Sequence, residues 1–132
     1  MKISKVEVIV PIGQYVLGDP CYAVPYEEWD GLLASCDYFR NPIGSIAKFK
    51  ILAFGTKLGD GCYAGSDGKE YPVDAGLIGL VPIELVEDLT EHQDNIVTFN
   101  KETICSTNGD GKLRFGHIVI DTDPEDEDEN AY

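Results

Sequence analysis

In the stretch Gly61-Cys62-Tyr63-Ala64, Gly65-Ser66-Asp67-Gly68, Lys69-Glu70-Tyr71-Pro72-Val73, two runs suited to β-strands flank a turn. Asp67-Gly68 supplies the positive φ angles that tight turns need, so the stretch predicts a β-hairpin. The composition agrees with a strand-rich fold, because seven tyrosines accompany a single tryptophan and aromatic residues suit a pleated, half-buried surface.

Other runs on both sides of this hairpin also predict strands. They cover residues 2–11, 14–17, 45–55, 77–81, 96–99, 102–106 and 112–121. The strongest turn signal, Asn108-Gly109-Asp110-Gly111, separates the last two runs. A helical turn or two is expected over 82–89. The spacing predicts a mainly antiparallel arrangement of strands.

One firm helix is predicted over 25–36. Pro25 suits its first turn, and four apolar residues share one face at i, i+3, i+4 and i+7: Trp29, Leu32, Leu33 and Cys36. The expected class is α+β, mainly β: a curled antiparallel sheet over one packed helix, or a small open barrel with that helix.

Length and charge divide the chain into two parts. The 132 residues suit one globular domain, expected over 1–121, followed by an acidic tail over 122–132. From Asp121 to Tyr132 there are seven acids and no base, which is half of the net charge of −14. Like-charge repulsion and the lack of apolar residues predict that this tail is disordered.

The acidic balance also limits the expected partners. Direct binding to nucleic acid or to an anionic membrane needs clustered lysine and arginine, and is not expected. A protein partner with a basic surface fits the charge, although an acidic tail also fits a purely solubilising role. Without a long apolar run or a signal-peptide pattern, a cytoplasmic location is expected. There the four evenly spread cysteines should be reduced and mostly buried, in preference to a disulfide framework or a zinc site.

The most specific feature of the sequence is an internal repeat. Leu17-Gly18-Asp19-Pro20-Cys21-Tyr22-Ala23 returns 41 residues later as Leu58-Gly59-Asp60-Gly61-Cys62-Tyr63-Ala64, with six of seven positions identical. In each copy a strand should end at the leucine, Gly-Asp should turn, and Cys-Tyr should resume an extended segment. The repeat therefore predicts two equivalent strand–turn–strand units.

Two interpretations of the repeat remain open. In the structural one, Asp19 and Asp60 cap their own turns, while the cysteine packs inward and the tyrosine lies across the sheet surface, or the reverse. In the functional one, the two loops meet and the carboxylates hold a divalent cation or perform acid–base chemistry. The candidate binding residues are Asp19, Cys21, Tyr22, Asp60, Cys62, Tyr63 and Asp74.

Catalytic residues and cofactors are not assigned by the sequence. A nucleophilic cysteine would need a neighbouring base, and only His92 and His117 are available. His117 lies in an apolar run, which predicts a histidine that is satisfied within a sheet in preference to a general base.

Three short motifs resemble small uncharacterised proteins of bacteria and their phages. These motifs are Gly18-Asp19-Pro20-Cys21-Tyr22, Gly59-Asp60-Gly61-Cys62-Tyr63 and Tyr71-Pro72-Val73-Asp74-Ala75-Gly76-Leu77. The last is also similar to a motif of the DUF4241 group. The resemblance covers about residues 14–81 and implies a bacterial or phage setting, without a reaction.

Two classes of function follow from these features. The first is a small acidic accessory binding protein, bacterial or phage-encoded, that engages a protein partner through its acidic surface or a sheet edge. The alternative is a small enzyme or divalent-cation-binding module built from the paired LGDxCYA loops. Size and charge favour the first class, and the repeat favours the second.

Overall fold

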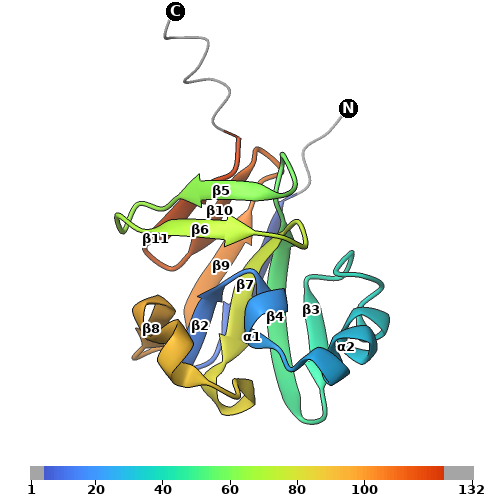
Figure 1. Ribbon diagram of the computed structural model, residues 1–132. Coiled ribbons are helices and arrows are strands. Elements are labelled where there is room, and N and C mark those ends of the chain that lie inside the picture. Colours follow the sequence, from blue (N-terminus) through green and yellow to red (C-terminus); the bar gives the residue numbers. More distant parts are fainter. Residues whose placement is uncertain (1–4, 124–132) are drawn as a thin grey trace, which may run out of the picture.

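The computed structural model describes residues 5–123 and shows three antiparallel sheets (Figure 1). One sheet has the strand order β1 (Val6–Val10), β9 (Thr103–Thr107), β10 (Lys112–Phe115), β11 (Ile118–Asp121). The second has the order β3 (Ile43–Ile46), β4 (Phe49–Gly55), β7 (Leu77–Pro82), β2 (Gly13–Gly18), β8 (Ile96–Phe99). The third is the predicted hairpin, β5 (Gly61–Ala64) and β6 (Glu70–Val73). The mainly β class is confirmed, and the sheets do not close into a barrel.

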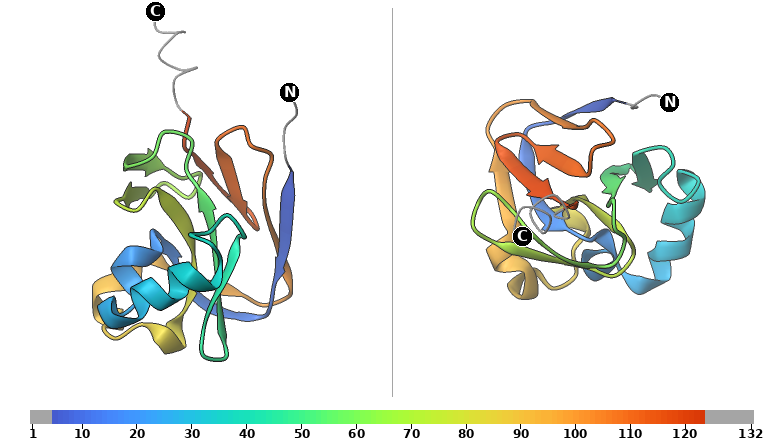
Figure 2. Two further views of the ribbon diagram at one scale, coloured as in Figure 1. Left: turned by 90° about the vertical axis from the view of Figure 1, so that its right-hand side faces the viewer. Right: turned by 90° about the horizontal axis from the view of Figure 1, so that it is seen from above.

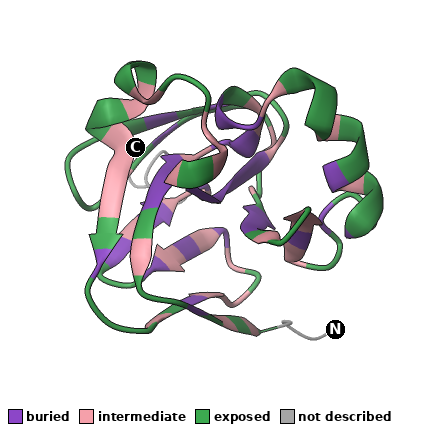
Figure 3. Cartoon of the chain, turned by 90° about the horizontal axis from the view of Figure 1, so that it is seen from below, coloured by how far each residue is buried: buried purple, intermediate pink, exposed green. Residues whose placement is uncertain are grey.

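The five-stranded sheet is covered on both faces (Figures 2 and 3). Its inner face packs against the four-stranded sheet, where Leu52 and Leu80 meet Leu113 and Phe115 in one core. Its outer face is covered by α1 (Pro20–Ala23), α2 (Trp29–Ser35) and 3₁₀ helices at Ile83–Leu85 and Leu89–Asn95. Because this sheet is sandwiched, β7 is buried along its whole length, as expected of a central strand.

The predicted helix is present but shorter. It consists of the 3₁₀ turn Tyr26–Glu28 followed by α2, which ends at Ser35. Leu32 is fully buried, and Trp29 and Leu33 pack partly buried against the same core. The predicted face is therefore the one that docks, with Leu32 at its centre.

Two predicted long strands are hairpins in the structure. The run 45–55 is interrupted by a turn at Ala47, whose φ of 53° lies in the left-handed region, so that β3 folds back on β4. The run 112–121 turns at Gly116, with φ 66°, and places His117 exposed in the turn and not within a sheet. Alanine is not one of the residue types that mark such turns, which explains why the sequence predicted one continuous strand over 45–55.

Three other expectations concern the cysteines, the tail and the membrane. All four cysteines are free thiols; Cys36 and Cys105 are buried, Cys21 is half-buried and Cys62 is exposed. The predicted disordered tail lies almost wholly outside the described residues, which end at Asp123. Within residues 5–123, no helix has the length and apolar character that crossing a bilayer requires.

Candidate functional site

The two copies of the repeat fold differently, so the predicted equivalence is wrong. In the first copy, Gly18 ends β2 and Asp19 caps α1, so that Cys21 and Tyr22 are helical. In the second copy, Cys62 and Tyr63 are instead extended, as part of β5. The single differing position separates them: Pro20, with its fixed φ, suits the first turn of a helix, whereas Gly61 permits the extended start of a strand.

A different feature recurs in the structure: three tyrosines each form a hydrogen bond that fixes the start of the strand to which they belong. Tyr15 donates its hydroxyl hydrogen to the Pro11 carbonyl at 2.8 Å, and Tyr63 donates to the Gly59 carbonyl at 2.8 Å. Tyr71 donates to the carboxylate of Asp67. Each partner lies four residues upstream, so each tyrosine closes the turn before its own strand. Tyr63, buried in the core, therefore corresponds in structure to Tyr15 and not to Tyr22, which is 47 % exposed.

Asp19 is buried, with 3 % of its surface exposed, and its carboxylate accepts three backbone N–H bonds. Oδ1 accepts from Cys21 at 3.0 Å, which caps α1. Oδ2 accepts from Asp74 at 2.8 Å and from Ala75 at 2.6 Å. Asp19 therefore ties the end of β2 to the loop between β6 and β7, which is more than the turn-capping interpretation predicts.

The structure brings some of the candidate residues together. Asp60 and Asp74 lie at the same end of the β5–β6 hairpin, since Gly61 pairs with Val73, and Asp19 binds the Asp74 backbone. Burial and then the charges of Asp74, Asp19 and Asp60 raise the pKa of Tyr22, which lies beside them. Among residues 5–123, however, no group of three or more histidine, cysteine or acidic side chains is arranged to hold a metal ion.

The cysteines of the repeat are poor nucleophiles in this environment. Burial, followed by the neighbouring Asp19 carboxylate, raises the pKa of the Cys21 thiol to about 12. Cys62 points toward Glu70, at 3.7 Å, and burial and this carboxylate raise its pKa as well. Since the thiolate is the reactive form, a raised pKa disfavours nucleophilic chemistry at both cysteines.

Alkaline pH should destabilise the fold. Burial raises the pKa of Cys105 to about 12, and burial followed by Asp67 raises the pKa of Tyr71. A raised folded-state pKa means that the stabilisation is complete below the thiol's ordinary pKa near 9 and is lost as pH rises toward 12. We expect Cys105 alone to contribute a fall of about 1.4 kcal/mol per pH unit across that window.

Urea unfolding under reducing conditions at intervals from pH 8 to pH 11 measures this loss. Cys105→Ala should lower the overall stability. It should also make the decline of the unfolding free energy with pH less steep, because one fewer group loses a proton on unfolding. Equal stability of the wild type at both ends of the range would contradict the expectation.

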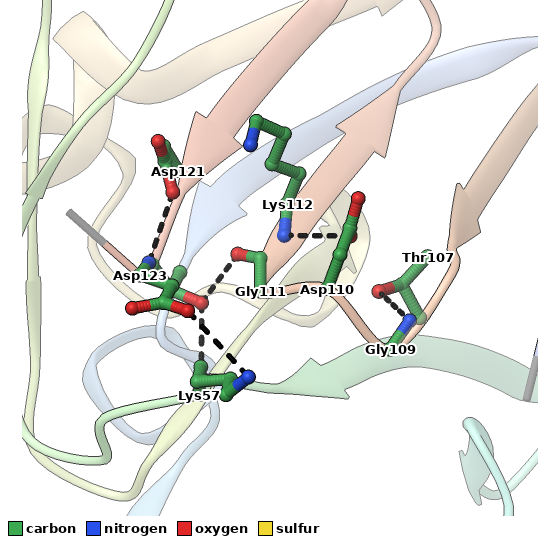
Figure 4. Close-up of polar contacts among 9 residues, drawn as sticks. Lys57, Thr107, Gly109, Asp110, Gly111, Lys112, Asp121 and Asp123 are labelled. Atoms are coloured by element: carbon green, nitrogen blue, oxygen red, sulfur yellow. Dashed lines mark hydrogen bonds and ion pairs between the residues drawn. The ribbon is translucent and has the colours of Figure 1, made fainter. Parts of the chain in front are cut away.

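Thr122 is also buried, and it anchors the end of β11 beside Lys57, Gly111 and Asp123, which Figure 4 labels. Its hydroxyl donates to the Gly111 carbonyl at 2.5 Å and accepts the Lys57 N–H at 2.9 Å. The Lys57 ammonium lies 3.5 Å from an Asp123 carboxylate oxygen. These contacts hold the last described residues to the domain, and Oδ1 of Asp123 is buried there without a hydrogen-bond partner among the described residues.

An apolar groove of about 480 Å³ lies between β1 and the β3–β4 hairpin. Figure 2 (left) views the molecule from the side on which both elements lie. The lining of the groove is mainly apolar and includes Val8, Ile43, Phe49, Leu52 and Leu80. The charged residues of the lining are Lys48, Lys50 and Glu84. Ile9 and Ile12, which also line it, are 62 % and 66 % exposed.

The backbone beside this groove has a free edge. All five residues of β1 pair with β9, and in the described part of the chain β1 has no strand on its other side. Edge strands usually carry charges or prolines that discourage further pairing. Lys5 and Glu7 form an exposed ion pair there, at 3.2 Å, but Ile9 and Ile12 leave the following portion apolar.

None of the predicted site residues lines this groove. Asp19 and Tyr22 border a separate hollow together with His92, while Cys62 and Tyr63 border another. One signal was present in the sequence: alternation that turns Val6, Val8 and Val10 inward leaves Ile9 facing outward. An outward isoleucine on a first strand is a weak sign of a binding surface, because single exposed apolar residues are common.

Comparison of the chain with protein-family models, curated proteins and solved structures gave no significant match.

Proposed function

We propose that this protein is an accessory binding protein, in a bacterial or phage setting, that takes an apolar segment of a partner protein into the groove beside β1. The proposal rests on the groove itself, which combines an apolar floor with two exposed isoleucines. Fully burying one isoleucine side chain is worth about 1.5–3 kcal/mol, so covering both would contribute substantially to affinity.

The acidic exterior supports the same function at longer range. With a net charge of −14, the protein attracts a partner that has a basic surface and steers its approach. The groove then provides the short-range contact, because only Lys48, Lys50 and Glu84 among its lining residues are charged. Attraction and docking therefore use different parts of the partner.

The alternative function, an enzyme or cation site at the repeat, has less support. All three hydrogen bonds to Asp19 come from the backbone of this chain, which makes the carboxylate a structural element. The neighbouring thiol of Cys21 is protonated at neutral pH, so it does not provide a nucleophile.

Capture of the partner from an extract of the cells that naturally make the protein tests the proposed function. We expect the double variant Ile9→Asp, Ile12→Asp to retain at least about tenfold less of one partner than the wild type, since a charge disfavours the apolar contact. The matched control is Tyr26→Asp, Leu58→Asp, because both residues are exposed, at 93 % and 45 %, and neither lines the groove.

The outcome that would refute the proposal is equal retention by the groove variant and the wild type. Loss of the same partner from the control variant would refute it as well. Circular dichroism and the thermal midpoint of each variant establish that the fold is retained.

A further inference from the structure

The two packed sheets are unequal in size. The inner layer has five strands and the sheet that covers it has four, ending at β1. Next to β1 the inner face of the larger sheet continues through Leu52 of β4 to Ile43 of β3, which pair with each other. Both residues line the groove, so the groove occupies the place where a fifth strand of the smaller sheet would lie.

We propose that the partner segment binds as this fifth strand, pairing its backbone with the free edge of β1, with alternate apolar side chains turned into the groove and a carboxylate near Lys48 and Lys50. This inference rests on the proposed function and specifies the chemistry of the partner segment.

The backbone of β1 favours a strand over other occupants. In an antiparallel sheet, alternate residues of an edge strand direct their N–H and C=O groups away from their neighbour. An apolar segment that covers this edge removes water from those groups, and any group left unpaired then carries the full cost of its desolvation. An added strand satisfies them with its own backbone, whereas a helix has already paired its backbone groups internally except at its two ends.

The charges at the groove specify one further property of the segment. The chain has 24 acidic and 10 basic residues, yet the charged lining consists of two lysines and one glutamate. Lys48 is exposed in the turn between β3 and β4, and Lys50 is exposed near the start of β4. The Lys48 ammonium lies 5.5 Å from the centre of the Phe49 ring. A carboxylate on the segment would therefore find two cations beside an apolar surface.

Amide hydrogen exchange measured by NMR with a synthetic peptide tests the inference. The probe has about nine residues, the length of a strand, with valine alternating with threonine and one glutamate near its end. We expect saturating peptide to slow exchange at least about tenfold at those β1 amides that exchange rapidly in the free protein. The control peptide has the same side chains and N-methyl groups at alternate amides, and it should give no such protection.

A charge-reversal variant tests the carboxylate. Lys48→Glu, Lys50→Glu should weaken binding of the glutamate peptide by about tenfold, and should affect a glutamine version of the peptide much less. Equal weakening of both peptides would overturn the assigned charge contact.

Three outcomes would overturn strand addition itself. The first is peptide binding in the groove without protection of β1, and the second is no binding of the peptide at all. In either case the proposed function still stands if the Ile9→Asp, Ile12→Asp variant loses its partner. The third is protection without peptide that grows with protein concentration, which would assign the edge to a second copy of the chain.

Discussion

Asp19→Asn is expected to lower the free energy of unfolding by about 2–4 kcal/mol, since hydrogen bonds to charged groups are worth about 1.5–3 kcal/mol each. Both carboxylate oxygens of Asp19 accept backbone N–H groups, from Cys21 on one side and from Asp74 and Ala75 on the other. An asparagine has only one oxygen. Its NH₂ group would therefore face an N–H donor in a position that is 3 % exposed.

The matched control is Asp60→Asn at the equivalent position of the repeat. Asp60 is exposed, so the expected change is within about 0.5 kcal/mol. Urea unfolding of the two variants and the wild type measures the difference. Similar stabilities of the two variants would show that Asp19 only caps its own turn, the case in which the sequence predicts a mild effect.

Gly79→Ala is expected to cost about 3 kcal/mol or more, because overpacking at a backbone contact leaves no flexible side chain to move aside. Gly79 lies in β7, where it pairs with Ala53 of β4 and Gly18 of β2. A Cβ atom added there would lie 1.9 Å from the Leu52 carbonyl oxygen and 2.7 Å from the Ala53 Cα. The variant can form only if β4 and β7 separate.

The same substitution in α2 should have the opposite sign. A Cβ atom at Gly31 meets nothing within 4 Å, so Gly31→Ala should stabilise the protein by about 0.5–1 kcal/mol through helix propensity. Thermal and urea unfolding of both variants test the pair. A Gly79→Ala protein as stable as the wild type would contradict the close packing of β4 on β7.

The sequence predicted those parts of the fold whose signals are local. The β5–β6 hairpin follows from Asp67-Gly68 between two strand-forming runs, and α2 follows from its apolar spacing. The β3–β4 turn was missed because Ala47 adopts a left-handed conformation that its residue type does not announce. Where a turn depends on the surrounding sheet, local propensity is a weak guide.

The repeat shows the same limit for the candidate site. Six identical positions predicted two identical units, but Tyr63 packs in the core while Tyr22 lies on the surface. Pairing of β5 with β6 fixes one copy, and the Asp19 contacts to the β6–β7 loop fix the other. Neither contact is visible within the seven residues of a repeat copy. The first needs the neighbouring strand β6, and the second joins residues that are 55 positions apart.

The groove could not be predicted, because no single segment forms it. It arises where a four-stranded sheet meets a five-stranded one, and its walls come from β1 and from the β3–β4 hairpin. The open edge of β1 becomes visible only when the partner of each strand is known. Only beside that edge do the exposed side chains of Ile9 and Ile12 indicate a binding surface.

Photo-crosslinking from the groove tests the central claim most directly. A photoreactive phenylalanine analogue is placed at Ile12, or at Tyr26 as the control, and the protein is irradiated in the cells that naturally make it. We expect one adduct from Ile12 alone, and fragment sequencing of that adduct should place the link in an extended segment with alternating apolar residues and a nearby acid. Adducts common to both positions, or links scattered over many unrelated proteins, would contradict the assignment of the groove as a binding site.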